Sequence, residues 1–275
     1  MAAFTGVAKN GDEWLTVGTD GTLSTFTCDG VLVSTSRWSS EPLRCIDSRG
    51  GDLAIGGDDR LLIKPRGERA FGRPMVGSHL PVWGVSFEKA GQRLVSCSSG
   101  WNTAEIWDMD SVKQVATFEG GWDLMCCDWH PSKPLVLIGG KDNTVRLWDL
   151  RSSAAPTKVE GHRNTVTTVR WNPFNDGATF CSGGRDHTFR VWDTANLRLD
   201  AMCRDEAGGE VRCSAWCGAD LVAYGTRCNG VGFLQFEQPP AVPWPADTEV
   251  NAMAYDAETL VAVGAGEHMV AHRIP

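Results

Sequence analysis

The sequence lacks the marks of a membrane, secreted or metal-binding protein. No apolar run approaches the roughly 18 residues that a membrane helix requires. Residues 1–10 hold no basic stretch followed by an apolar one, so no secretory signal is expected. The ten cysteines form no Cys-x-x-Cys pair, so no zinc site is expected, and no cofactor is expected either. We predict buried, reduced thiols in an intracellular protein.

The sequence also lacks an excess of basic residues and a phosphate-binding glycine loop. Its 34 acidic and 26 basic residues give a net charge of −8. This balance argues against a surface that broadly coats nucleic acid, although a local basic patch remains compatible with it. The pairs Gly56-Gly57 and Gly139-Gly140 are expected in turns between strands, with no following helix to complete a nucleotide-binding motif.

The clearest feature present is a repeated Trp-Asp dipeptide. Trp107-Asp108, Trp148-Asp149 and Trp192-Asp193 lie 41 and 44 residues apart and end the runs AEIWD, VRLWD and FRVWD. In the last two, an Asp stands six residues before the Trp. Turn residues at matching places divide the chain into seven units of about 40 residues: Asp20, Asp59, Asn102, Asp142, Asp186, Asn229 and Glu267.

The fifth unit shows the internal pattern best. Four short strand-like runs, at 166–171, 178–183, 188–192 and 197–203, are separated by turn residues such as Asn172-Pro173. Trp171 and Trp192 end two of these runs, and we predict that both are core aromatics and not ligand-stacking residues.

This period and its Trp-Asp ending resemble the WD-repeat family, which implies an all-β fold, a seven-bladed β-propeller. One domain is expected over residues 1–275, with blades at approximately 1–40, 41–76, 77–119, 120–160, 161–206, 207–246 and 247–275. The resemblance also implies a structural hydrogen-bond chain through His162, Ser182, Asp186 and Trp192. A catalytic triad is the rival interpretation of these residues, but Ser182 lies within a strand and not on a nucleophile-bearing turn.

The last blade is expected to lack its outer strand. The first unit begins its first strand near Phe4, and the seventh ends with its third strand, over residues 267–275. An unpaired edge invites strand addition, so a partner that donates a strand is one hypothesis. A three-stranded last blade covered by side chains is the alternative.

The resemblance places the usual partner-binding surface on the top face of the ring. In that family the contact positions flank the start of each first strand and precede the turn Asp. We transfer these positions to this sequence residue by residue. They give a mixed set with one Trp, one Met and four basic residues: Arg44, Trp83, Met125, Lys141, Thr167, Arg185, Arg212 and Asn251, with Asp58 beside them. Aromatic and Arg side chains are frequent interface hot spots, and the bases would suit an acidic or phosphate-bearing ligand. A solvated loop rim is the alternative.

Units four and five resemble the WD-repeat subunits of pre-mRNA cleavage and polyadenylation complexes, through CCDWHPSKPLVLIGGKD (126–142) and HRNTVTTVRW (162–171). That resemblance implies a nuclear, non-catalytic subunit that contacts other protein subunits. Those proteins carry a basic arm before the propeller, and residues 1–3 supply none, so direct RNA binding is not expected. The run 147–151 with His162 also looks like the WD-repeat import receptors for peroxisomal proteins, which bind a targeting peptide.

Two classes of function remain at this point. A binding scaffold without chemistry is favoured by the repeat. An enzyme or small-molecule binder that uses the central channel is the distant alternative. Its candidate paired acids are Asp58 with Asp59 and Asp108 with Asp110, but these are explained more simply as residues of tight turns.

Overall fold

The structure is a computed structural model that describes residues 3–66, 73–74, 81–204, 209–228, 230–235, 249–256, 259–265 and 269–273. Within these ranges the chain forms strands and turns and no helix. The predicted turn residues Asn229 and Glu267 lie outside the described residues.

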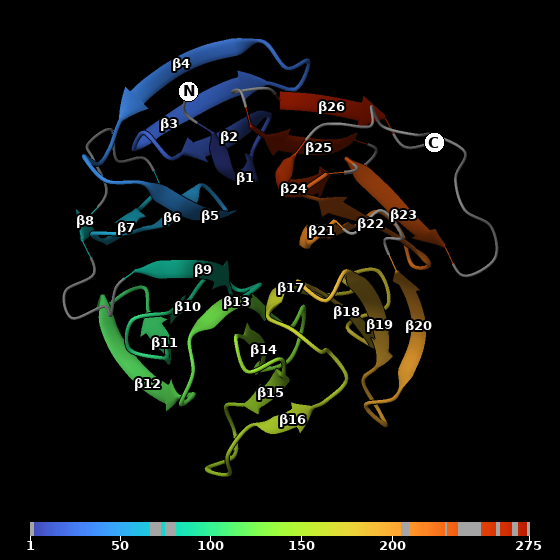
Figure 1. Ribbon diagram of the computed structural model, residues 1–275. Helices are drawn as coiled ribbons and strands as arrows, with labels where there is room; N and C mark the ends of the chain where they lie inside the picture. Colours follow the sequence, from blue (N-terminus) through green and yellow to red (C-terminus); the bar gives the residue numbers. More distant parts are fainter. Residues whose placement is uncertain are drawn as a thin grey trace.

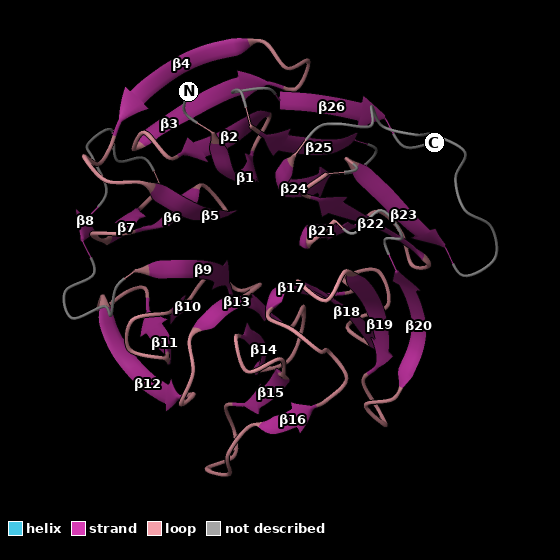
Figure 2. Ribbon diagram, viewed as in Figure 1, coloured by secondary structure: helices cyan, strands magenta, loops and turns pink. Residues whose placement is uncertain are grey.

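Seven antiparallel sheets stand around a common axis like the blades of a propeller (Figures 1 and 2). Within each sheet the strands follow chain order, from the axis outward, so each blade is a meander of hairpins. Each sheet falls inside one of the seven ranges predicted from the repeat.

The first four blades each contain four strands. Blade 1 has β1 (Phe4–Asn10), β2 (Glu13–Gly18), β3 (Thr22–Thr27) and β4 (Leu32–Arg37). Blade 2 has β5 (Leu43–Arg49), β6 (Asp52–Gly57), β7 (Leu61–Lys64) and β8 (Arg73–Pro74). Blade 3 has β9 (Val82–Phe87), β10 (Arg93–Ser98), β11 (Thr103–Asp108) and β12 (Lys113–Glu119). Blade 4 has β13 (Leu124–Trp129), β14 (Leu135–Gly140), β15 (Val145–Asp149) and β16 (Thr157–Val159).

The last three blades complete the ring. Blade 5 has β17 (Val166–Trp171), β18 (Thr179–Gly184), β19 (Thr188–Asp193) and β20 (Leu199–Arg204), which matches the four predicted runs to within two residues. Blade 6 has β21 (Val211–Trp216), β22 (Leu221–Thr226) and β23 (Val231–Gln235). Blade 7 has β24 (Val250–Asp256), β25 (Thr259–Gly264) and β26 (Met269–Arg273).

Turn chemistry places the hairpins. Asn143 and His187 directly follow the turn residues Asp142 and Asp186, and both adopt a left-handed backbone, with φ of 66° and 63°. Asp186 accepts a hydrogen bond from the backbone N–H of Thr188 at 3.2 Å, which closes the turn before the third strand. The repeated Asp therefore shapes the turn, which explains why it recurs at a fixed distance before the Trp.

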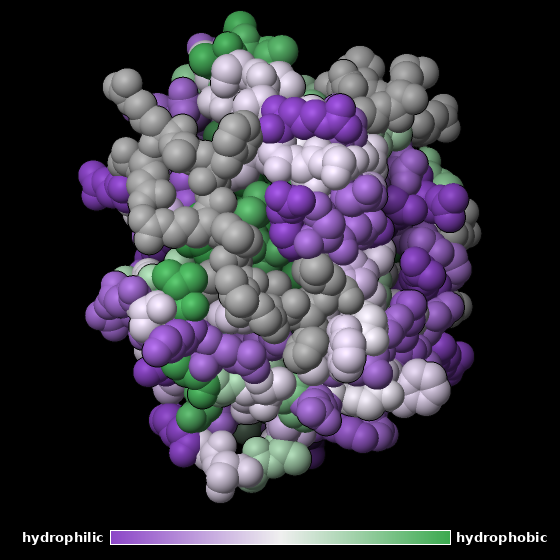
Figure 3. All heavy atoms as spheres, turned by 90° about the vertical axis from the view of Figure 1, so that its left-hand side faces the viewer, coloured by the Kyte–Doolittle hydropathy of each residue, from purple (hydrophilic) through white to green (hydrophobic). Residues whose placement is uncertain are grey.

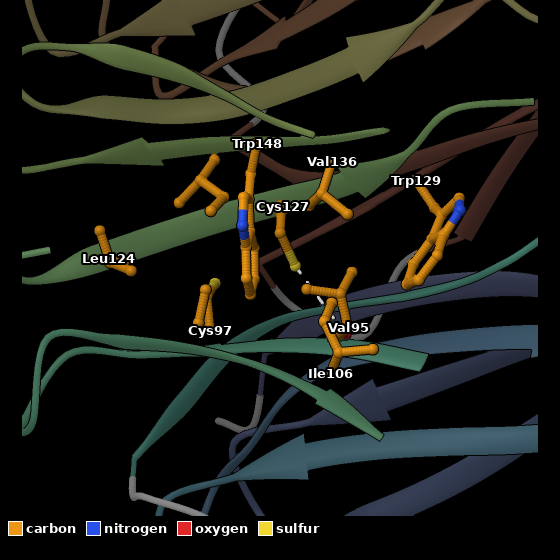
Figure 4. Close-up of a cluster of buried hydrophobic side chains, with 10 residues drawn as sticks. Val95, Cys97, Ile106, Leu124, Cys127, Trp129, Val136 and Trp148 are labelled. Carbon is orange, nitrogen blue, oxygen red and sulfur yellow. Dashed lines mark hydrogen bonds between the residues drawn. The ribbon is translucent and has the colours of Figure 1, made fainter. Parts of the chain in front are cut away.

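The core lies between blades. In Figure 4, Val95 and Ile106 of blade 3 pack against Cys127 and Trp148 of blade 4, and the thiol of Cys127 donates to the carbonyl of Val95 at 4.0 Å. Trp171 and Trp192, predicted to be core aromatics, are both buried. Each blade thus covers its apolar face with its neighbour, and the ring buries one continuous series of clusters.

Blade 7 closes the ring against blade 1 through side chains and through one backbone β-bridge between Ala3 and Ala265. Asn251 donates its amide N–H to the carbonyl of Phe4 at 3.0 Å, and Lys9 pairs with Asp256 at 3.3 Å. Phe4 and Phe26 share an apolar cluster with Val261 and Val263 of blade 7. Within the described residues, blades 6 and 7 each have three strands. The strand donor therefore remains a hypothesis.

The outer edge of blade 1 begins with an exposed apolar run. Val31, Leu32 and Val33 are 61%, 55% and 54% exposed, and all six residues of β4 are exposed. Figure 3 shows apolar atoms gathered at the upper edge of the molecule, where β4 is the outermost strand. The single charge of β4 is Arg37 at its end, whereas β12 carries Lys113 and Glu119 at its two ends, and such charges protect an edge from pairing with another chain.

Candidate protein-binding site

The first strand of each blade begins at one end of the central channel, which we call the top mouth. A cavity of about 470 Å³ occupies this mouth. It collects most of the residues predicted for the binding face, namely Arg44, Trp83, Met125, Thr167, Arg185, Arg212 and Asn251. Lys141 does not line the cavity; it lies with Asp123 on the same side of blade 4.

The four predicted bases are all paired with carboxylates. Arg44 forms a two-pronged pair with Asp58, with 2.9 Å between Nη2 and Oδ2. The other three pairs join Lys141 to Asp123, Arg185 to Glu210 at 3.9 Å, and Arg212 to Glu249. Four bases are thus balanced by four acids. An anionic ligand would have to displace carboxylates that are already in place, which disfavours a purely phosphate-driven site.

Several polar groups in the mouth hold neighbouring blades together. The hydroxyl of Thr167 donates to the carbonyl of Val211 in the next blade. Arg212 donates to the side-chain oxygen of Asn251 at 2.6 Å, and Asn251 in turn donates to blade 1. These three predicted contact residues therefore also have a structural role, which their positions in the sequence do not reveal.

Trp83 is held in place and partly covered. Its indole N–H donates to the hydroxyl of Ser99 at 2.8 Å. The guanidinium carbon of Arg44 lies 4.0 Å from the centroid of its ring, a cation–π arrangement. One ring face is therefore occupied by Arg44, which is itself fixed by Asp58.

Two more tryptophans, which sequence reasoning did not select, are far more exposed. Trp101 on the β10–β11 loop is 66% exposed and Trp122 on the β12–β13 loop is 63% exposed. The N–H of Gly120 donates to the carbonyl of Asn102 at 2.6 Å, which ties the two loops together beside Trp83. We call Trp83, Trp101, Trp122 and Met125 the tryptophan surface. Trp101 precedes Asn102 as Lys141 precedes Asp142 and Arg185 precedes Asp186. A Trp at this turn position departs from the repeat, and that departure could have identified it.

The opposite end of the channel, the bottom mouth, carries a cavity of about 410 Å³. Here Asp128 of blade 4 accepts the backbone N–H of Trp171 in blade 5 at 2.7 Å and pairs with Arg170 at 3.0 Å. Asp47 accepts the N–H of Phe87 in the same way, also at 2.7 Å. Burial raises the pKa of Asp47 to about 6, against opposing hydrogen bonds and the charge of Arg170. These acids join blades and resemble no paired catalytic acids.

The chain of four residues predicted for blade 5 is present. His162 Nε2 lies 2.7 Å from the hydroxyl of Ser182, and Nδ1 lies 3.0 Å from a carboxylate oxygen of Asp186. Trp192 donates its indole N–H to Ser182 at 2.8 Å. Although burial opposes its charge, hydrogen bonds from His162 and the Arg163 backbone hold the pKa of Asp186 well below its usual range. Ser182 is fully buried, so no substrate can reach its hydroxyl.

Burial makes several thiols unreactive, whereas Cys28 and Cys228 are exposed. All ten cysteines are free, and burial raises the pKa of Cys181, Cys213 and Cys217 to about 12, which suppresses the reactive thiolate.

Across the described ranges, no group of three or more potential ligands gathers into a metal site. The same part of the chain contains no helix long and apolar enough to cross a membrane.

Comparisons with known proteins match the repeat. The profile described as "WD domain, G-beta repeat" matches residues 74–108, 112–149 and 155–193, and each match ends on one of the three Trp-Asp pairs. The three stretches and the ring of seven sheets define the class of this chain, a seven-bladed β-propeller. Its three matched stretches are WD repeats.

Individual relatives are similar over short stretches. "Polyadenylation factor subunit 2" of Neurospora crassa and of Gibberella zeae are each 42% identical over 66 residues, which is 24% of this chain and 10% or 11% of those proteins. "Transcription initiation factor TFIID subunit 5" of Caenorhabditis elegans is 29% identical over 126 residues, 42% of this chain and 19% of that protein. The matches thus span less than a fifth of these relatives.

Proposed function

We propose that this chain is a non-catalytic scaffold that binds other protein subunits through the top mouth and the adjoining tryptophan surface. The observation that carries this proposal is the pair of tryptophans, Trp101 and Trp122, that are exposed by more than 60% on two loops joined by a hydrogen bond. Exposed tryptophans cost solubility, and they are the side chains most enriched in interface hot spots. The paired charges around them suit a rim that excludes water without demanding a charged ligand.

We further propose that the assembly is an mRNA 3′-end cleavage and polyadenylation complex and that the chain works in the nucleus. The support is the 42% identity to proteins named "Polyadenylation factor subunit 2". Direct contact with RNA is not part of the proposal, because the four bases of the top face already have carboxylate partners.

Affinity purification of the tagged chain from its native cell, followed by mass spectrometry, tests both levels. Cleavage and polyadenylation subunits should co-purify, and Trp122→Ala should lose them while it stays folded. Recovery of a different defined complex would refute the polyadenylation role and keep the scaffold. Recovery of no protein above the untagged background would refute both. Imaging of the tagged chain outside the nucleus would also contradict the role in mRNA processing.

A further inference from the structure

The outer edge of blade 1 is an unpaired strand with no charge in its interior. Strand β4 pairs with β3 on one side, and no strand covers its other side in the part of the chain that the structure describes. The residues of the run Val31–Val33 are each more than half exposed, and a Ser-Thr-Ser run follows them. Such an edge presents backbone N–H and C=O groups to another strand, and covering the apolar run is favourable.

The ladder between β3 and β4 contains one irregularity, which limits the strands that can pair with β4. Leu32 lies opposite Phe26, and Thr35 lies opposite Ser24. The side chains of Leu32 and Thr35 line one cavity of about 270 Å³, so they lie on the same face of the sheet. In a regular strand, residues three apart point to opposite faces, because side chains alternate. A regular strand therefore cannot match both faces of β4 along its length, whereas a strand with the same irregularity can.

A second copy of β4 that runs antiparallel has this irregularity at the matching place. With a two-fold axis between Val33 and Ser34, Leu32 lies opposite Thr35 of the second copy, and Thr35 lies opposite its Leu32. Both of these pairs then fall on the same face of the sheet. Val33 lies opposite Ser34 of the second copy, so the apolar run packs against small hydroxyl residues.

The charges at the two ends of β4 are complementary in this arrangement. Arg37 ends the strand, and Asp29 is exposed at the tip of the hairpin that precedes it. The six residues of β4, at about 3.3 Å each, hold these ends roughly 20 Å apart, so the two side chains do not meet within one chain. Across the described residues neither forms an ion pair, and Arg37 donates to the carbonyl of Ser39 at 3.1 Å. The two-fold axis brings Arg37 of each copy opposite Gly30 of the other, beside Asp29.

From these features we infer that two copies of the chain form a two-fold dimer in which their β4 strands pair antiparallel and join the two first blades into one sheet. The contact lies on the rim of the ring, where β4 is the outermost strand of blade 1 (Figure 1). It leaves both mouths of the channel open, so the inference does not depend on the proposed function. Two paired strands make a small interface, and the dimer should therefore form at high protein concentration.

Two charge variants of the full chain test this register. Arg37→Asp places acids opposite acids at both ends of the pair, and Asp29→Arg places bases opposite bases. Either variant alone should self-associate more weakly than the wild type by roughly fivefold or more. An equimolar mixture restores both contacts between opposite charges and should recover the association. Each variant changes the net charge of −8 by two and stays acidic, so attraction between whole molecules cannot explain the recovery. Sedimentation equilibrium measures the association constants.

The fourth strand of blade 3 provides the matched control. Lys113 and Glu119 stand at its two ends, but Val115 is its one large apolar side chain with more than half its surface exposed. A mixture of Lys113→Glu and Glu119→Lys should associate no differently from either variant alone. Equal melting temperatures would show that all variants are folded. A wild type that stays monomeric overturns the inference, as does a mixture of Arg37→Asp and Asp29→Arg that recovers nothing. An equal recovery in the blade 3 mixture would overturn it too, because any charged blade edge would then suffice.

Discussion

Asp128 of blade 4 accepts the backbone N–H of Trp171 in blade 5 at 2.7 Å. The acid lies on the channel side of its strand, where the carboxylate also holds Arg170. Ser86 performs the same task one blade earlier, since its hydroxyl accepts the N–H of Trp129 at 3.1 Å. Side chains from one blade therefore fix the first strand of the next. These hydrogen bonds between blades set the spacing of the ring.

Removal of the Asp128 carboxylate should loosen the ring. Asp128→Ala leaves the Trp171 N–H without its acceptor and Arg170 without its counter-ion, and it should lower the free energy of unfolding by about 1–3 kcal/mol. Urea denaturation followed by tryptophan fluorescence measures this loss. Asp110→Ala is the control, because that acid is exposed in a turn, and its effect should stay within about 0.5 kcal/mol. Equal effects of the two variants would contradict the role of Asp128 in joining blades 4 and 5.

Ser182 should matter for stability and not for catalysis. Ser182→Ala leaves the indole N–H of Trp192 and one ring nitrogen of His162 without their hydrogen-bond partner. This loss should lower the free energy of unfolding by about 1–3 kcal/mol. Ser153→Ala, on an exposed loop, is the control and should be neutral. A serine-reactive fluorophosphonate should label neither the wild type nor Ser182→Ala. Labelling that Ser182→Ala abolishes would instead support the triad interpretation.

Asp47 should give the ring a measurable pH dependence. Its pKa is raised to about 6 by burial, so the folded state holds the proton more tightly than the unfolded state does. The stability contributed by protonation is complete below the ordinary pKa near 4 and is lost as the pH rises through about 6. The unfolding free energy of the wild type minus that of Asp47→Asn should therefore fall between pH 4 and pH 7.5. A flat difference, or a rising one, would refute the assignment.

The charge pairs of the top mouth should suppress binding of polyanions. Glu210→Gln/Glu249→Gln releases Arg185 and Arg212, and this double variant should elute from heparin at higher salt than the wild type. Asp12→Asn/Asp29→Asn changes the net charge equally at exposed acids away from the mouth and should elute earlier than the first variant. Coincident elution of the two double variants would mean that net charge alone governs retention.

The apolar edge of blade 1 should drive weak self-association. Val33→Lys places a charge within the exposed run Val31–Val33 and should reduce light scattering at high protein concentration. Val115 is a matched control, 55% exposed on the fourth strand of blade 3. Val115→Lys should scatter as the wild type does, because charged residues already protect that edge. Equal reduction by both variants would point to a general effect of added charge.

The sequence predicts the ring well because its signal is repeated. The turn Asp and the third-strand Trp each contact residues of their own blade, so a single unit such as blade 5 shows the pattern in full. The binding face is harder to predict, because its properties depend on contacts between units. No spacing rule pairs Arg212 with Glu249 of the next blade, or brings the loop of Trp101 against the loop of Trp122.

The run Asp128–Pro131, on which the sequence resemblance to polyadenylation factors partly rests, has a structural role in this ring. Asp128 joins two blades, and the ring of His130 accepts the N–H groups of Ser132 and Lys133 and packs on Trp171. Burial lowers the pKa of His130 to about 4, with a further contribution from Lys133. The run Asp128–Pro131 therefore serves packing and turn formation, which are shared needs of many propellers. We therefore expect partner choice to depend on the exposed loops.

Hydrogen–deuterium exchange of the chain, alone and within the complex purified from its native cell, tests the central claim most directly. The account predicts that binding protects residues 99–102 and 120–123, the loops of Trp101 and Trp122, and leaves the bottom-mouth turn at residues 130–134 unchanged. Protection of residues 130–134 with no change in the two tryptophan loops would contradict it.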